Sequence, residues 1–107
     1  MASGKDIKLI YREIKEYIEV LKSRNIDVSA AYLFGSYADD RADEWSDIDV
    51  AILTDKFIGD RIDFKFLLMK IARDIDPDIE PHPCLAKEFN ESNPFASLVM
   101  KSGERVF

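Results

Sequence analysis

The segment DIDVAILTD, residues 47–55, constrains the fold more than any other stretch of the chain. Its apolar and β-branched residues are bounded by polar ones, a pattern that favours a strand. Because strand side chains alternate, Asp47 and Asp49 share one face. The other face carries the apolar residues Ile48, Val50 and Ile52. We therefore expect a strand with one face in the core and a second face that carries two carboxylates.

Two other segments also favour strands. DVSAAYLF, residues 27–34, runs directly into Gly35-Ser36, and DIEPHPCLA spans residues 78–86. Pro81 and Pro83 lack backbone N–H donors and, being two residues apart, direct the missing donors toward the same side. The strand at residues 78–86 is therefore expected at or near a sheet edge.

Apolar residues recur at steps of three and four in segments 5–22 and 60–75, which predicts two amphipathic helices. Pro77 ends the second, because a proline disfavours helical geometry in the residue before it. The predicted apolar face of the second helix comprises Ile62, Phe66, Met69, Ala72 and Ile75, widened by Leu67, Leu68 and Ile71.

A third, shorter helix is expected near the end of the sequence. Asn93 suits its N-cap and Pro94 its first position, and the helix continues through Met100 until Ser102-Gly103 closes it. The order helix, strand, strand, helix, strand, helix predicts an α/β (α+β) fold in which a small mixed sheet packs against helices.

Length and charge restrict the classes of function. The 107 residues suit one domain, residues 1–107, and the net charge of −6 without a basic cluster disfavours direct nucleic-acid binding. No apolar stretch reaches the roughly 20 residues of a membrane span, and the start lacks a signal-peptide core. Cys84 has no cysteine partner. These features predict a cytoplasmic protein.

Two weak signals for chemistry flank the segment between the first two strands. On a strand, the Cα atoms of Asp47 and Asp49 lie about 6 to 7 Å apart. At that spacing both carboxylates can reach one divalent cation, or two cations roughly 4 Å apart. Oxygen ligands favour Mg²⁺ or Mn²⁺ over zinc. Gly35 allows close backbone approach to a phosphate, and the Ser36 hydroxyl adds a hydrogen bond. Taken alone, a Gly-Ser pair more often marks an ordinary turn, and Asp-x-Asp on a strand more often marks a solvated face.

Together these signals form a known pattern, because Gly35-Ser36 precedes Asp47-Ile48-Asp49 by ten residues. The sequences FGSYA and SDIDVAI resemble the nucleotidyltransferase superfamily of DNA polymerase beta, and within it the minimal nucleotidyltransferases. The hallmark of that family is Gly-Ser, a spacer, then Asp-x-Asp or Asp-x-Glu between two strands. The chain departs from the family at Asp40, where the spacer commonly has a glycine that can adopt positive φ.

The resemblance implies transfer of a nucleoside monophosphate from an NTP, ATP being the expected donor, to a hydroxyl group, with two Mg²⁺ ions and three carboxylates. It implies that Asp47 and Asp49 are metal ligands and that Gly35 and Ser36 hold the triphosphate. Glu80 is our choice for the third carboxylate. Asp78 is the alternative, because strand parity places Asp78, Glu80 and His82 on one face.

Several other residues have two readings. His82 either binds phosphate or assists proton transfer, or it is an ordinary histidine at a strand edge. Arg41 and Lys87 either neutralise phosphate or are solvated. Trp45 either stacks on a base or caps the core, and Cys84 is expected to be a small buried residue.

The resemblance also implies a partner. Larger members of the superfamily carry a helical acceptor-binding domain, for which 107 residues leave no room, and minimal members pair with helical HEPN-type toxins as antitoxins. We therefore expect an antitoxin that adenylylates a tyrosine of such a toxin. Two alternatives stay open: a binding module that neutralises its partner sterically, and nucleotidyl transfer to a small-molecule hydroxyl. The sequence leaves homo-oligomerisation undecided.

Overall fold

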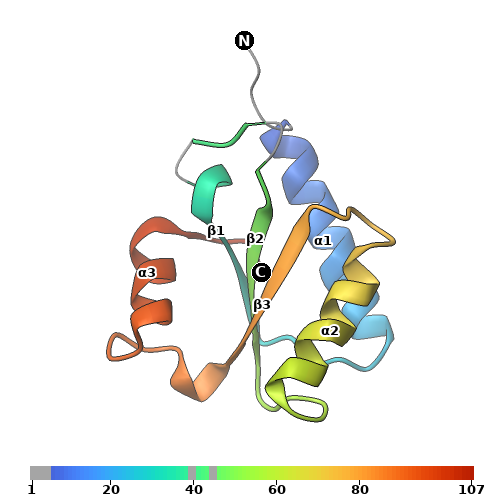
Figure 1. The fold of residues 1–107 in the computed structure, drawn as a ribbon, viewed down its shortest axis with the longest axis vertical. Helices are drawn as coiled ribbons and strands as arrows, with labels where there is room; N and C mark the ends of the chain where they lie inside the picture. Colours follow the sequence, from blue (N-terminus) through green and yellow to red (C-terminus); the bar gives the residue numbers. More distant parts are fainter. Residues whose placement is uncertain (1–5, 39–40, 44–45) are drawn as a thin grey trace.

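The computed structural model describes residues 6–38, 41–43 and 46–107. A four-stranded mixed sheet lies at its centre, in the order β3-β2-β1-β4 (Figure 1). Strands β1 (Ala30–Phe34) and β2 (Ile48–Thr54) are antiparallel, and β2 pairs in parallel with β3 (Ile79–Leu85). The two-residue strand β4 (Glu104–Arg105) pairs with β1 and was not predicted. The predicted fold class, a small mixed sheet packed against helices, is confirmed.

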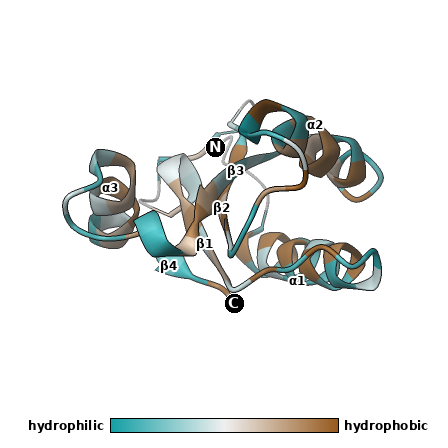
Figure 2. Cartoon of the chain, turned by 90° about the horizontal axis from the view of Figure 1, so that it is seen from below, coloured by the Kyte–Doolittle hydropathy of each residue, from teal (hydrophilic) through white to brown (hydrophobic). Residues whose placement is uncertain are grey.

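Helices cover both faces of this sheet. Helices α1 (Ile7–Ser23) and α2 (Arg61–Ala72) pack on one face, and α3 (Pro94–Ser102) packs on the other, as the end-on view shows (Figure 2). Short 3₁₀ turns, η1 (Gly35–Tyr37) and η2 (Ala86–Glu88), follow β1 and β3. None of the helices in the described ranges has both the length and the apolar character of a membrane span.

Side-chain caps fix the starts of the helices. The carboxylate of Asp6 accepts from the backbone N–H of Lys8, and that of Asp60 accepts from Asp63. The side chain of Asn93 accepts from the backbone N–H of Phe95, which confirms the predicted N-cap ahead of Pro94. The third helix ends at Ser102, slightly beyond the predicted end at Met100.

The larger core lies between the sheet and the first two helices. The β2 residues Ile48, Val50 and Ile52 are fully buried there, as the alternation in the sequence predicts. Tyr17 of α1 is also fully buried, and its hydroxyl donates to the carbonyl oxygen of Leu68 on α2, 2.8 Å away. Burial raises the pKa of this phenol. This hydrogen bond links α1 to α2 on the face of the sheet that both helices cover.

The opposite face of β2, on which the sequence places Asp49, is more buried than predicted. Ala51 and Leu53 are buried on it and form a second, smaller core with Cys84 and with Val99 of α3. Asp49 lies on the same face, at the end of this apolar cluster. The physical reason is that α3 packs over this face and excludes water from most of it.

The predicted apolar face of α2 is correct only in part. Leu68, Ile71 and Ala72 are buried as predicted, and Phe64, which was not predicted, is also buried. Ile62 and Phe66, which were predicted to be buried, are 66% and 64% exposed. Phe64 and Leu68 have the same spacing as Ile62 and Phe66, so this helix carries two competing apolar stripes. The tertiary structure selects the stripe that contains Phe64, and the periodicity of the sequence does not distinguish between them.

The edge position predicted for the proline-containing strand is confirmed, since β3 ends the strand order. A residue's N–H and C=O point to the same side of a strand. The carbonyl oxygen of Pro83 accepts from Nη2 of Arg61, which lies 3.1 Å away on α2, outside the sheet ladder. The missing donor of Pro83 therefore also points away from β2, where it interrupts no pairing.

Candidate functional site

The site begins at the turn that follows β1. Gly35 and Ser36 open η1 immediately after Phe34, and Gly35 has a φ of +77°, in the left-handed region that favours glycine. Phe34 pairs with Asp49 in the antiparallel register of β1 and β2. The pairing of the two strands thus places the Gly-Ser turn beside the Asp-x-Asp segment.

Asp49 is in direct contact with this turn. A Cβ added to Gly35 would lie only 2.4 Å from Oδ2 of Asp49, closer than two such atoms can approach. The flanking residues Ile48 and Val50 are fully buried on the opposite face, which anchors the backbone of Asp49. Glycine is therefore favoured at position 35 for two reasons: its backbone φ is positive, and the Asp49 carboxylate occupies the space that a side chain would need.

Glu80 stands beside Asp49 on the neighbouring strand. The two residues are direct partners in the parallel register of β2 and β3. Oε1 of Glu80 lies 3.9 Å from Nζ of Lys65 on α2, and both side chains are partly exposed. A pair at this distance and exposure contributes little to stability, so the Glu80 carboxylate is accessible to another cation.

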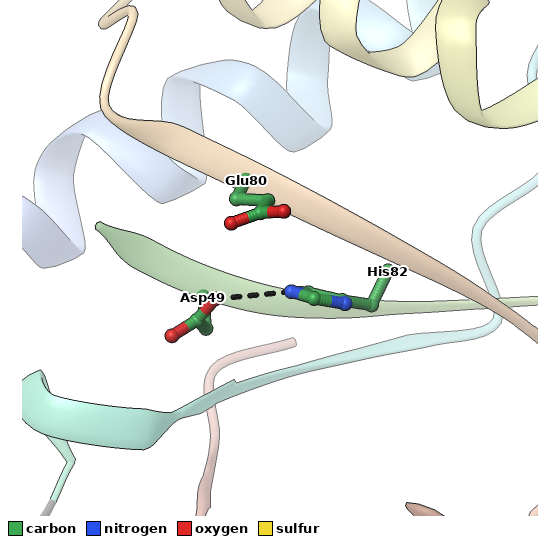
Figure 3. A group of neighbouring side chains, drawn as sticks. All are labelled: Asp49, Glu80 and His82. Atoms are coloured by element: carbon green, nitrogen blue, oxygen red, sulfur yellow. Dashed lines mark hydrogen bonds and ion pairs between the residues drawn. The ribbon is translucent and has the colours of Figure 1, made fainter.

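His82 completes the group from two residues further along β3. Its Nε2 lies 3.0 Å from Oδ1 of Asp49, and the two side chains point toward each other across the sheet (Figure 3). The imidazole ring packs edge-on against Phe34, with ring centroids 5.0 Å apart, and lies 5.9 Å from the ring of Phe95 on α3. Apolar contacts from two elements thus hold the ring in place.

Asp49, Glu80 and His82 form a cluster that is suited to a divalent cation. One ligand atom from each residue can be chosen so that all three lie within 4.8 Å of one another. Ligands on opposite sides of a small divalent ion stand roughly 4.2 Å apart, given metal–oxygen distances of about 2.1 Å. The spacing of the two carboxylates within this group is therefore close to what one such ion requires. The two carboxylates offer the oxygen donors that Mg²⁺ or Mn²⁺ prefers, whereas an imidazole nitrogen suits softer metals better, and that of His82 is already in contact with Asp49.

The other predicted carboxylates lie outside this cluster. Asp47 precedes β2 and is exposed. Asp78 precedes β3, is exposed, and uses its backbone carbonyl to accept from Ile48 N–H at 2.8 Å. Between the two candidates for a third carboxylate, the strand pairing therefore brings Glu80, and not Asp78, beside Asp49.

Sequence reasoning left the role of His82 open and did not predict its contact with Asp49. The available signal was strand parity, which places His82 on the face of Glu80. Cys84, two residues further, is buried as predicted, and burial raises the pKa of its thiol. Lys87 is exposed on η2, and Arg41 is exposed in the loop after η1. Asp40 and Trp45 lie outside the described residues.

Comparisons with known proteins agree with this architecture. A model of the family described as "Polymerase beta, Nucleotidyltransferase" matches residues 12–107. A comparison with curated proteins finds no match. Among solved structures, a toxin-antitoxin crystallised with AMP-PNP is similar over 91% of this chain and 72% of its own, with a TM-score of 0.64 and 23% identity.

Two other solved structures are similar to a comparable degree. The toxin-antitoxin MntA-HepT aligns over 89% of this chain and 69% of its own, with a TM-score of 0.56 and 21% identity. A putative nucleotidyltransferase from Sulfolobus solfataricus aligns over 79% of this chain and 80% of its own, with a TM-score of 0.57 and 21% identity. At these identities the likenesses show a shared fold.

Proposed function

The chain belongs to the polymerase beta nucleotidyltransferase family, and we propose that it transfers AMP from ATP to a hydroxyl group of a partner protein. The observation that carries this proposal is the contact between the Gly35 turn and Asp49, with Glu80 beside it. A turn able to bind phosphate and a pair of carboxylates able to bind cations are the two parts that nucleotidyl transfer requires.

Each residue has a proposed role. Gly35 and Ser36 bind the triphosphate through backbone N–H groups and the serine hydroxyl. Asp49 and Glu80, with Asp47 at the start of β2, hold Mg²⁺, for which Mn²⁺ can substitute. Bound there, the divalent metal supplies positive charge that offsets the negative charge of the phosphates.

The proposed reaction is an in-line displacement at the α-phosphorus of ATP. The oxygen of the acceptor hydroxyl forms a bond to the α-phosphorus, the bond from that phosphorus to the bridging oxygen breaks, and pyrophosphate leaves. The hydroxyl proton passes to a nearby base. Glu80 suits this role because its carboxylate is partly exposed and stands beside Asp49.

The proposed acceptor is a tyrosine of a HEPN-type toxin, for which this chain acts as antitoxin. Support comes from the similar solved structures, two of which are toxin-antitoxin assemblies, one of them with AMP-PNP. Incubation of the chain with its partner, ATP and Mg²⁺, followed by mass spectrometry of the partner, tests the proposal. One added adenylate group on a tyrosine is expected. An unmodified partner that is nevertheless neutralised would contradict it.

A second candidate function is a binding module that neutralises its partner by contact alone. The observation that favours it is the position of Asp47, which lies exposed ahead of β2 and outside the three-residue cluster. The double variant Asp47→Asn and Asp49→Asn separates the two functions. Neutralisation that survives both substitutions supports the binding module, and neutralisation that is lost while the complex still forms supports the enzyme.

A further inference from the structure

The carboxylate of Asp49 is confined on two sides. Oδ2 occupies the space where Gly35 would carry a Cβ, and Oδ1 lies 3.0 Å from Nε2 of His82 (Figure 3). A carboxylate has no proton to donate, so the ring nitrogen is the donor in this hydrogen bond. The side chains of Asp49 and His82 are 24% and 25% exposed, so solvent only partly screens the contact.

His82 is itself held in place. Its ring has aromatic neighbours from two elements, Phe34 on β1 and Phe95 on α3, and these two rings also pack edge-on against each other with centroids 5.4 Å apart. Pro81 and Pro83 flank it in the sequence and restrict the backbone φ on either side. A donor fixed in this way limits the orientations that Asp49 can adopt.

We propose that His82 is a positioning residue that orients Asp49 for cation binding, an inference that rests on the proposed nucleotidyltransferase function. Its Nε2–H fixes Oδ1, so that the carboxylate keeps one orientation between the Gly-Ser turn and Glu80. Groups that orient metal ligands by hydrogen bonds typically change metal affinity by about 10- to 100-fold when removed. A role in packing alone would require the ring but not its nitrogen.

Two substitutions separate these roles. His82→Phe keeps an aromatic ring between Phe34 and Phe95 and removes the donor. His82→Gln keeps an amide N–H at about the reach of Nε2 and removes the ring. We therefore expect His82→Phe to weaken the binding of Mn²⁺ by about tenfold or more, and His82→Gln to stay within about threefold of the wild type.

The probe is Mn²⁺ alone, titrated into the full chain without nucleotide, with the free ion followed by electron paramagnetic resonance. Thermal melting of each variant shows whether it is folded, and a loss of affinity counts only in a folded protein. If His82→Phe fails to fold, the His82→Gln variant and the wild-type spectrum still decide. Wild-type affinity in a folded His82→Phe variant would overturn the inference, as would an equal loss in both variants.

Pulsed electron paramagnetic resonance of the Mn²⁺-loaded wild type tests the remaining alternative, that His82 binds the ion directly. The proposal predicts no coupling from a directly bound imidazole nitrogen, and such a coupling would overturn it. The Asp49→Asn variant distinguishes this failure from failure of the proposed function. If wild type binds no Mn²⁺, or if Asp49→Asn binds it equally well, the cation site itself is wrong. If only the His82 variants behave unexpectedly, the site stands and the positioning role fails.

Discussion

Gly35 and Asp49 are in contact across the antiparallel pair β1 and β2: a Cβ on the glycine would stand 2.4 Å from Oδ2 of the aspartate. We propose different roles for the two residues, phosphate binding for the turn at Gly35 and cation binding for Asp49. Here they share a surface, so a change at the turn displaces the carboxylate. The phosphate-binding and cation-binding parts of the proposed site are therefore mechanically coupled.

The first prediction concerns this contact. Gly35→Ala introduces a side chain at a φ of +77° and forces Asp49 to move. We expect a loss of about 1–3 kcal/mol in the free energy of unfolding and a loss of nucleotidyl transfer that exceeds what reduced stability explains. Urea denaturation and transfer assays on the same preparations measure the two effects.

Gly59→Ala is the matched control for that experiment. Gly59 has a φ of +75°, and a Cβ there would lie 3.1 Å from Oδ2 of Asp63, away from the cluster. We expect Gly59→Ala to lower the free energy of unfolding through a similar backbone strain, and to leave nucleotidyl transfer unchanged. Equal losses of transfer in both variants would mean that strain, and not the displacement of Asp49, accounts for the effect of Gly35→Ala.

The second prediction tests which stripe of α2 is buried. Leu68 is fully buried, whereas Phe66, two residues earlier, is 64% exposed. Leu68→Ala should lower the free energy of unfolding by about 2–5 kcal/mol. Phe66→Ala should change it by no more than about 0.5 kcal/mol. The reverse order in urea denaturation would mean that the helix packs through the stripe containing Phe66.

These two cases show where sequence patterns suffice and where they do not. The two strands and the Gly35-Ser36 turn are predictable because each is encoded by a few consecutive residues, and Asp49 follows only a short distance along the chain. The stripe of α2 is not predictable in this way, because Phe64 and Leu68 repeat with the same period as Ile62 and Phe66. Packing against α1 and the sheet chooses between them.

The contact between His82 and Asp49 illustrates a second limit. Parity places His82, Glu80 and Asp78 on one face of their strand, but parity does not say which strand lies next to it. The parallel pairing of β2 with β3, made through α2, brings Glu80 opposite Asp49 and His82 within reach of it. The same pairing begins only at Ile79, which leaves Asp78 outside the strand. Strand β4, with two residues, is too short to produce a pattern.

The third prediction concerns alkaline pH. The hydroxyl of Tyr11 on α1 donates to Oε2 of Glu104 on β4. This hydrogen bond, with smaller effects from burial and from the charge of Glu104, raises the pKa of Tyr11 from 10.0 to about 12. A raised pKa in the folded state means that the stabilisation is complete below pH 10.0 and is lost as the pH rises toward about 12.

The Tyr11→Phe variant isolates this contribution, because Tyr17 and other groups also titrate at high pH. We expect the free energy of unfolding of the wild type to fall more steeply than that of the variant between about pH 10 and 12. Denaturation at a series of pH values measures both slopes. Parallel slopes would show that the hydrogen bond to Glu104 does not persist in solution.

The fourth prediction concerns ligand-linked stability. Carboxylates of Asp49 and Glu80 placed side by side repel each other, and a cation with bound nucleotide relieves that repulsion. Mg²⁺ with ATP should therefore raise the melting temperature, by mass action on the folded state, and Asp49→Asn should reduce the increase. A thermal shift assay measures both. An unchanged melting temperature with Mg²⁺ and ATP together would count against a functional site.

The most direct test of the proposed reaction follows the fate of each phosphate of ATP. With the partner and Mg²⁺ present, label at the α-phosphate should become covalently attached to the partner, and label at the γ-phosphate should appear in pyrophosphate. Both signals should disappear in Asp49→Asn. Transfer of the γ-label to the partner, or α-label transfer that is unaffected by Asp49→Asn, would contradict the assignment of this site to nucleotidyl transfer.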